Sequence, residues 1–342
     1  MAMACRRLFC LRAWQYNKLR RMKSPRSLVL LAALGLLALV GVRGQVAVPT
    51  RAKLVPAEDK HPQANLRVDT TLVLVPVSVC DPANHPVTGL EKEHFKIFDD
   101  KVEQTVTHFA MDDESVAVGL VLDISGSMGP KLRRSRQAAA AFFDTANPED
   151  EFFLVEFNDQ PKLMVPLTRN VEEIQNQLTF TQSKGRTALL DAIMLSLHEI
   201  KKSQKNRKAL LIVSDGGDNS SRYTEGEVRN LVRESDVLIY AIGVFEPFGS
   251  RGRTPEESAG PGLLSEITEQ TGGRHFPADT GELPDIAAKI GIELRNRYVL
   301  GYSPSPSVRD GRYHRLQVKL IPPRGLPPLK AFWRLGYYAP AE

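Results

Sequence analysis

An aspartate and two serines follow an almost continuous apolar run near the middle of the chain. The run is Val116–Leu122, and Asp123, Ser125 and Ser127 come next, on a loop that also contains Gly126. An apolar run of this length is typical of a strand buried on both faces of a parallel sheet. The spacing i, i+2, i+4 lets alternate side chains of an extended loop converge on one point. We therefore expect one carboxylate and two hydroxyls to meet at the end of a buried strand.

Two further oxygen-bearing side chains stand at comparable places later in the chain. Thr187 precedes a predicted helix, and Asp215 follows the apolar run Ala209–Val213. Functional groups of an open α/β sheet collect at the carboxyl ends of its strands, so these two residues are expected to join the first three. Two carboxylates and three hydroxyls form a hard, all-oxygen donor set. Such a set suits Mg²⁺ or Mn²⁺ and does not suit zinc, which prefers histidine and cysteine.

This donor set resembles the metal-ion-dependent adhesion site of the von Willebrand factor type A family. The family pattern is Asp-x-Ser-x-Ser, then a threonine, then an aspartate after a later strand. The chain matches all five positions in order, at Asp123, Ser125, Ser127, Thr187 and Asp215. The specific resemblance extends over residues 114–298. More loosely, the flanking segments Tyr298–Tyr302 and Gly336–Tyr338 resemble secreted bacterial proteins of the acidobacterial-type group of this family.

The resemblance implies how such a site binds. In the family, hydroxyls contact the ion directly, while the aspartates act through water or through hydrogen bonds to those hydroxyls. The charge of the ion is then poorly neutralised, and one coordination position stays open for a carboxylate from a partner. The resemblance thus implies an exported, non-enzymatic adhesion module with Mg²⁺ or Mn²⁺ as cofactor and a protein ligand that supplies an Asp or Glu side chain. Asp218 is interpreted either as a support for the metal ligands or as a turn residue.

Each of these residues alone also has a plainer interpretation. Ser125, Ser127 and Thr187 could cap the helices that follow them, and Asp215 could be a turn residue before two glycines. A structural domain of the same family with a vestigial metal site is therefore an alternative function. A metal-dependent hydrolase with Ser127 as nucleophile is a less favoured one, because these loops contain no histidine and the Gly-x-Ser-x-Gly elbow is missing. Intracellular proteins of the metal-chelatase or ATPase-associated kind are disfavoured, because residues 1–44 have the features of an export signal described below.

Apolar runs and helical segments alternate around the candidate ligands. The predicted strands are 116–122, 152–157, 162–165, 209–213, 237–242 and 274–276, and the predicted helices are 131–146, 171–178, 188–202, 225–234, 262–270 and 282–297. Such alternation indicates βαβ units. We predict an α/β fold for residues 114–298, with a doubly wound, mostly parallel sheet of the von Willebrand factor type A or Rossmann-like kind.

The segments on either side of this domain have the pattern of β structure. The strand-like runs are 66–79, 95–98 and 102–109 before the domain, and 298–302, 313–321 and 331–338 after it. We expect the segments 65–113 and 299–342 to pair into one β module, with the α/β domain inserted between its two halves.

The first 44 residues have the features of a secretory signal peptide. The uncharged stretch Ser27–Val42 holds 16 residues, follows a basic segment and precedes the small residue Gly44. A membrane-spanning helix needs about 20 apolar residues, whereas a stretch of this length suits the core of a signal peptide. We predict a secreted, periplasmic or cell-surface protein with residues 45–64 as a linker. Residues 1–21 are interpreted as an over-extended start; an uncleaved anchor and a twin-arginine signal at Arg20-Arg21 are the alternatives.

Charge and cysteine content narrow the class of protein. The 342 residues include 45 Lys and Arg against 40 Asp and Glu, but nine of the basic residues lie in residues 1–44, which hold no acidic residue. The remainder carries 36 basic and 40 acidic residues, so the basic balance gives no support for nucleic-acid binding. Its single cysteine, Cys80, cannot form an intramolecular disulfide and is expected to be a buried, small apolar residue.

Two features next to the predicted site bear on the choice of partner. The Gly- and Pro-rich loop Glu246–Gly262 follows the predicted strand 237–242 at the edge of the sheet that carries the predicted metal ligands. It is interpreted either as a recognition loop or as a flexible insertion. Four basic residues follow the first metal loop and either steer an acidic ligand or form a solvated helix face. They are Lys131, Arg133, Arg134 and Arg136.

Overall fold

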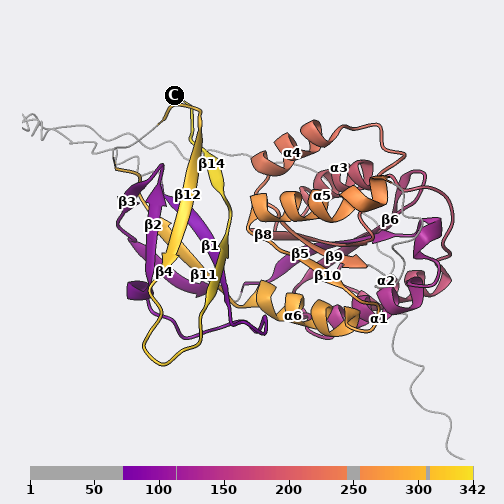
Figure 1. Ribbon diagram of the computed structural model, residues 1–342, viewed down its shortest axis with the longest axis horizontal. Coiled ribbons are helices and arrows are strands. Elements are labelled where there is room, and N and C mark those ends of the chain that lie inside the picture. The colour runs from indigo at the N-terminus through magenta and orange to yellow at the C-terminus, as the bar shows by residue number, and fades with distance from the viewer. Residues whose placement is uncertain (1–71, 113, 245–254, 306–308, 342) are drawn as a thin grey trace, which may run out of the picture. The chain divides into compact units, whose positions relative to one another are not determined.

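The structure is a computed structural model that describes residues 72–112, 114–244, 255–305 and 309–341 (Figure 1). All of these residues lie in one of the two units into which the chain divides, the one from Leu66 to Glu342. The predicted signal peptide and linker, residues 1–64, lie outside the described residues. So does part of the loop predicted at Glu246–Gly262.

A six-stranded sheet forms the centre of the α/β domain (Figure 1). Its order is β10-β9-β8-β5-β6-β7, and all neighbours are parallel except β7, which runs antiparallel to β6. All eight residues of β5 are buried, which explains why its sequence is almost continuously apolar. The strands are β5 (Val116–Asp123), β6 (Glu151–Phe157), β7 (Pro161–Thr168), β8 (Arg207–Ser214), β9 (Leu238–Val244) and β10 (His275–Ala278). The predicted doubly wound, mostly parallel sheet is confirmed.

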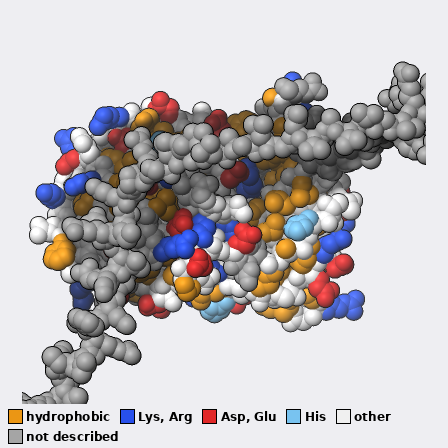
Figure 2. Space-filling model, turned by 180° about the vertical axis from the view of Figure 1, so that it is seen from behind, with side chains coloured by type: hydrophobic (Ala, Val, Ile, Leu, Met, Phe, Trp, Pro, Cys, Tyr) orange, Lys and Arg blue, Asp and Glu red, His pale blue; other side chains and the backbone are white. Residues whose placement is uncertain are grey.

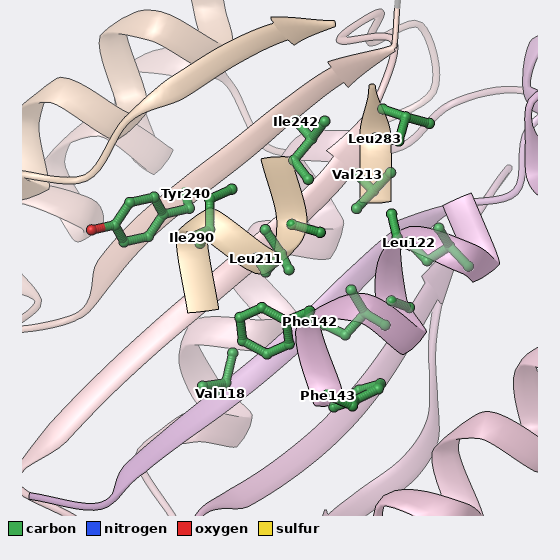
Figure 3. Close-up of a cluster of buried hydrophobic side chains, with 14 of the residues drawn as sticks. Val118, Leu122, Phe142, Phe143, Leu211, Val213, Tyr240, Ile242, Leu283 and Ile290 are labelled. Carbon is green, nitrogen blue, oxygen red and sulfur yellow. The ribbon is translucent and has the colours of Figure 1, made fainter. Parts of the chain in front are cut away.

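Within the described residues, six α-helices pack on the two faces of this sheet. They are α1 (Leu132–Phe143), α2 (Val171–Phe180), α3 (Leu189–Ile200), α4 (Glu225–Glu234), α5 (Pro255–Thr271) and α6 (Leu283–Arg295). Figure 1 shows α1 and α6 on one face and α3, α4 and α5 on the other. On the first face, Phe142 and Ile290 pack against Leu211 and Ile242 of the strands (Figure 3). None of the helices in the described part of the chain is long and apolar enough to span a membrane.

Two four-stranded antiparallel sheets form what we call the β module. Their orders are β13-β1-β11-β4 and β14-β12-β2-β3. The strands are β1 (Val73–Cys80), β2 (Phe95–Asp99), β3 (Val102–Gln104), β4 (His108–Asp112), β11 (Arg297–Tyr302), β12 (Tyr313–Leu320), β13 (Lys330–Trp333) and β14 (Gly336–Tyr338); a short 3₁₀ helix, Lys92–His94, precedes β2. Val75, Ile97, Tyr298 and Val318 belong to one apolar cluster that joins the two sheets. Each sheet combines strands from both flanks of the α/β domain. The exact domain boundaries remain predictions.

Two of the predicted strands are each divided in the structure, for the same physical reason. The run predicted at 102–109 is β3 and β4, and the run predicted at 331–338 is β13 and β14. In both cases the chain leaves one sheet of the β module for the other: β3 pairs with β2 but β4 with β11, and β13 pairs with β1 but β14 with β12. Neither run contains a proline that would mark the end of a strand, so the sequence did not reveal the change of sheet.

One predicted helix is longer than expected. The prediction at 262–270 corresponds to α5, which begins at Pro255. Proline is tolerated in the first turn of a helix because its missing N–H is not needed there. Pro255 therefore begins a helix, whereas the sequence pattern predicted a loop at this residue. Residues 255–262 of the predicted loop Glu246–Gly262 are therefore helical, and residues 245–254 lie outside the described residues.

The α/β domain and the β module are joined by a pair of strands and by a buried polar cluster. β4, the last strand before the domain, runs antiparallel to β11, the first strand after it, with Asp112 opposite Arg297. Nearby, Glu293 accepts a hydrogen bond from Arg274 Nη1 at 2.8 Å and one from the hydroxyl of Tyr240 at 2.9 Å. The thiol of Cys80 is buried beside Glu293, with 3.7 Å between Sγ and Oε2. Cys80 is thus buried as predicted, but among polar groups.

Candidate metal site

Hydrogen bonds around Asp123 hold the first strand-end loop. Asp123 is fully buried at the end of β5. Its Oδ1 accepts a hydrogen bond from the backbone N–H of Ser125 at 2.8 Å, and its Oδ2 accepts one from the hydroxyl of Ser214 at 2.6 Å. The hydroxyl oxygens of Ser125 and Ser127 are 3.1 Å apart. The structure thus brings one carboxylate and two hydroxyls together, as the spacing of these residues predicts.

The loop that carries Thr187 is tied to the other two loops through its backbone. The N–H of Gly126 donates to the carbonyl oxygen of Gly185 at 3.0 Å. Thr187, which is buried, accepts a hydrogen bond on its own carbonyl oxygen from the N–H of Asn219 at 3.0 Å. The backbone of Thr187 is therefore fixed between the loop after β5 and the loop after β8.

Asp215 forms a buried ion pair that the sequence did not indicate. Lys131 Nζ lies 3.2 Å from Asp215 Oδ2, and the two side chains are only 10% and 8% exposed. The other oxygen of Asp215, Oδ1, is buried and has no hydrogen-bond partner. The interpretation of Lys131 as part of a solvated helix face is therefore wrong, because its side chain is buried. The two residues are 84 positions apart, so only the packing of α1 against the loop after β8 reveals the pair.

The other three basic residues of the predicted cluster differ from Lys131. Arg133 is exposed, as a solvated helix face requires. Arg134 donates to the side chain of Gln137, and Arg136 donates to the carbonyl oxygen of Thr181 at the end of α2. Figure 2 shows acidic and basic side chains interspersed on the face it presents.

Burial and a neighbouring charge alter the acidity of Asp123. Loss of water and, second, the negative charge of Asp215 raise the pKa of the Asp123 carboxyl to about 7. Hydrogen bonds from Ser125 and Ser214 act in the opposite direction. Two buried carboxylates thus interact unfavourably, and the ammonium group of Lys131 pairs with one of them, Asp215. A divalent cation would supply the missing positive charge. The unpartnered Asp215 Oδ1 and the all-oxygen donor set both fit Mg²⁺ or Mn²⁺.

Gly216 and Asp218 shape the loop after β8. Gly216 has a φ of +83°, and a Cβ at this position would lie 2.8 Å from the backbone of Gly260. Glycine is therefore required both by the left-handed backbone and by the close approach of α5. Asp218 Oδ2 accepts hydrogen bonds from the backbone N–H of Leu190 at 2.9 Å and from the hydroxyl of Ser221 at 2.6 Å. Asp218 thus supports the start of α3, close after Thr187, in addition to shaping its own turn.

Residues 118–217 match the von Willebrand factor type A domain family. The match begins inside β5 and ends two residues after Asp215, so it includes all five predicted metal ligands. The chain therefore contains a von Willebrand factor type A domain, a kind of module known for adhesion and protein–protein interaction.

Individual curated proteins and solved structures are similar to part of the chain. An uncharacterized protein of Borreliella burgdorferi is 27% identical over 178 residues, which are 46% of this chain and 52% of that protein. Inter-alpha-trypsin inhibitor heavy chain H4 of Bos taurus is 33% identical over 115 residues, 31% of this chain and 12% of that protein. The chain thus covers about half, or much less, of these curated relatives. A solved von Willebrand factor type A structure from Catenulispora acidiphila is 12% identical with a TM-score of 0.47, covering 80% of this chain and 75% of that one.

Proposed function

We propose that the protein is an exported, non-enzymatic binding module that uses a divalent cation to bind an acidic group of a protein partner. Asp123, Ser125, Ser127, Thr187 and Asp215 would hold Mg²⁺ or Mn²⁺. The observation that carries this proposal is the unpartnered, buried Oδ1 of Asp215 beside the buried carboxylate of Asp123, in a cluster whose donors are all oxygen.

The charges of the site explain why the partner group should be an acid. With both carboxylates ionised, Asp123, Asp215 and Lys131 together carry one net negative charge. A bound divalent cation supplies two positive charges and a coordination position for an outside oxygen. The sum is then one net positive charge, which a carboxylate from the partner neutralises. The ammonium group of Lys131, which already pairs with Asp215, is part of the reason why the loaded site carries a net positive charge.

Export would follow from residues 1–44 acting as a signal peptide. The mature protein would then work in the periplasm or at the cell surface, with membrane contact only through the leader or, as the alternative, through an uncleaved anchor. N-terminal sequencing of the exported protein checks this part of the proposal. A mature chain that begins at Gln45 supports cleavage, and a retained leader supports the anchor.

Calorimetric titration with Mg²⁺ tests the metal site. We expect binding heat from the wild type and none from Asp123→Ala, because the variant loses a buried carboxylate of the site. Asp144→Ala is a matched control, since Asp144 is an exposed aspartate at the far end of α1. A wild type that binds neither Mg²⁺ nor Mn²⁺ would favour the alternative of a structural domain with a vestigial site.

Capture of partners with and without a chelator tests adhesion. Proteins bound by the wild type should be released by EDTA and should not bind Asp123→Ala, whereas Asp144→Ala should retain them. A partner set that is the same in all of these conditions would contradict cation-dependent binding. A hydrolase is less well supported, because the loops at residues 123–129, 181–188 and 214–221 offer no histidine as a base.

A further inference from the structure

A second group of metal-ligating side chains lies in the β module. Asp99 ends β2, Asp100 follows in the turn to β3, and His314 lies on β12. One ligand atom of each lies within 4.8 Å of the others. His314 Nδ1 is 3.4 Å from Asp99 Oδ1 and 3.0 Å from Asp100 Oδ2. The cluster joins the segment before the α/β domain to the segment after it.

Asp99 is held so that one of its oxygens faces His314 without a hydrogen bond. Its Oδ2 accepts hydrogen bonds from the hydroxyls of Tyr302 at 2.8 Å and Tyr337 at 2.9 Å. Both tyrosine hydroxyls are therefore donors to this one oxygen. Its Oδ1 is buried and has no hydrogen-bond partner, and the residue is only 6% exposed. A buried carboxylate oxygen without a donor is costly unless a ligand satisfies it.

Asp100 and His314 are oriented in the same way. Asp100 Oδ1 accepts a hydrogen bond from the backbone N–H of Arg315 at 3.0 Å, which leaves Oδ2 toward His314. His314 Nε2 lies 3.2 Å from Asp310 Oδ1, which leaves Nδ1 toward the two aspartates. A carboxylate on the outer ring nitrogen is the usual support of a metal-bound histidine. Each of the three residues therefore has one atom fixed by a neighbour and one atom converging on a common point.

We propose that Asp99, Asp100 and His314 form a binding site for a zinc-type divalent cation, with Asp310 as the positioning residue of His314. Ligand bonds of about 2.0–2.2 Å in a tetrahedral site place the ligand atoms about 3.3 Å apart. The separations of 3.0 and 3.4 Å at His314 Nδ1 need only small adjustments to meet this geometry. A mixed nitrogen and oxygen set suits zinc better than the magnesium expected at the first site. The half-exposed Asp100 leaves a path for the ion to enter.

Charge favours a metal ion over a proton at this place. A protonated His314 brings one positive charge to face the carboxylates of Asp99, Asp100 and Asp310. A zinc ion bound to the neutral ring brings two, and it also satisfies the buried Asp99 Oδ1. Since the ligands come from both flanks of the α/β domain, the ion would hold β2 and β12 together. Such a site adds its binding free energy to the stability of the β module.

Zinc titration of the full chain tests this site independently of the magnesium site. We expect His314→Gln to bind one Zn²⁺ fewer than the wild type. Asp100→Asn should lower the affinity for that ion at least tenfold. Asp100 is half exposed, so Asp100→Asn should fold even if His314→Gln does not. Asp310→Asn should lower the affinity for the same ion by about 10- to 100-fold, as the loss of a supporting carboxylate does.

Two controls separate this proposal from the function proposed above. His85→Gln removes a histidine of the same module that pairs with one aspartate on the surface, and it should leave the zinc affinity unchanged. Asp123→Ala should abolish Mg²⁺ binding and keep this Zn²⁺, whereas Asp100→Asn should weaken Zn²⁺ binding and leave Mg²⁺ binding unchanged. The same zinc stoichiometry and affinity in the wild type, His314→Gln and Asp100→Asn would overturn the proposed zinc site, whatever happens to magnesium. So would a wild type that binds no zinc.

Discussion

The two candidate metal sites differ in how the chain brings their residues together. In the α/β domain, three of the five ligands lie within five consecutive residues, on a loop at the end of β5. In the β module, His314 meets Asp99 and Asp100 from more than 200 positions away, because β12 pairs with β2 in a register that places Leu316 opposite Asp99. The first site can be recognised from local spacing. The second depends on strand register, which no local pattern shows.

Both sites also contain a basic side chain of the protein itself. Lys131 pairs with Asp215 in the first, and His314 faces Asp99 and Asp100 in the second. Buried carboxylates without any compensation would be strongly unfavourable. The comparison suggests that each region holds its acidic residues beside a basic side chain. A metal ion at the first site must share Asp215 with Lys131, whereas a metal ion at the second site must replace a proton on His314.

The largest effect is expected from breaking the internal ion pair of the first site. Lys131→Met should lower the free energy of unfolding by about 3–5 kcal/mol without metal, because a buried Asp215 is left uncompensated. Mg²⁺ should restore more stability to this variant than to the wild type, since the ion no longer shares Asp215 with an ammonium group. Urea denaturation with and without Mg²⁺ measures both effects.

The exposed residue Arg133 on the same helix provides the control for this prediction. Arg133→Met should leave the stability and its response to Mg²⁺ nearly unchanged. Equal losses in the two variants would show that the Lys131–Asp215 pair has no special role.

A smaller effect is expected from removing one hydrogen bond to Asp99 in the second site. Tyr302→Phe should destabilise the protein by about 1.5–3 kcal/mol, the usual contribution of a hydrogen bond to a buried charged group. Chemical denaturation measures it, with Tyr338→Phe as the control because Tyr338 is 43% exposed. Zinc affinity should fall with Tyr302→Phe while magnesium affinity stays unchanged. A change in magnesium affinity would mean that the two sites are not independent.

The smallest effect concerns Cys80, at the junction of the two regions. Burial, and then the negative charge of Glu293, raises the pKa of its thiol from 9.0 to about 12. The unfolded chain therefore ionises at lower pH than the folded one, and this part of the stability is present below pH 9 and lost between pH 9 and 12. By pH 10 the loss should be about 1.4 kcal/mol. Urea denaturation at pH 8 and pH 10 should show a smaller change for Cys80→Ala than for the wild type; equal changes would contradict the prediction.

Sequence patterns were sufficient for the parallel sheet and for the clustering around Asp123. The buried strand β5 is almost continuously apolar, and its end carries Asp123, Ser125 and Ser127 at a spacing that few other structures require. The change of sheet between β3 and β4 was not predictable, because the run contains no proline that would mark the end of a strand. The Lys131–Asp215 pair was missed for a related reason: a lysine on a helix has the same sequence pattern whether it faces solvent or a distant carboxylate.

The pairing of β4 with β11 determines how the protein responds to a pulling force. These strands lead the chain into and out of the α/β domain, and their backbones are hydrogen-bonded to each other with Asp112 opposite Arg297. Tension applied along the chain can pass across this pair without stretching the inserted domain. We therefore expect the loops around Asp123 to keep their shape under such a load until β4 and β11 separate.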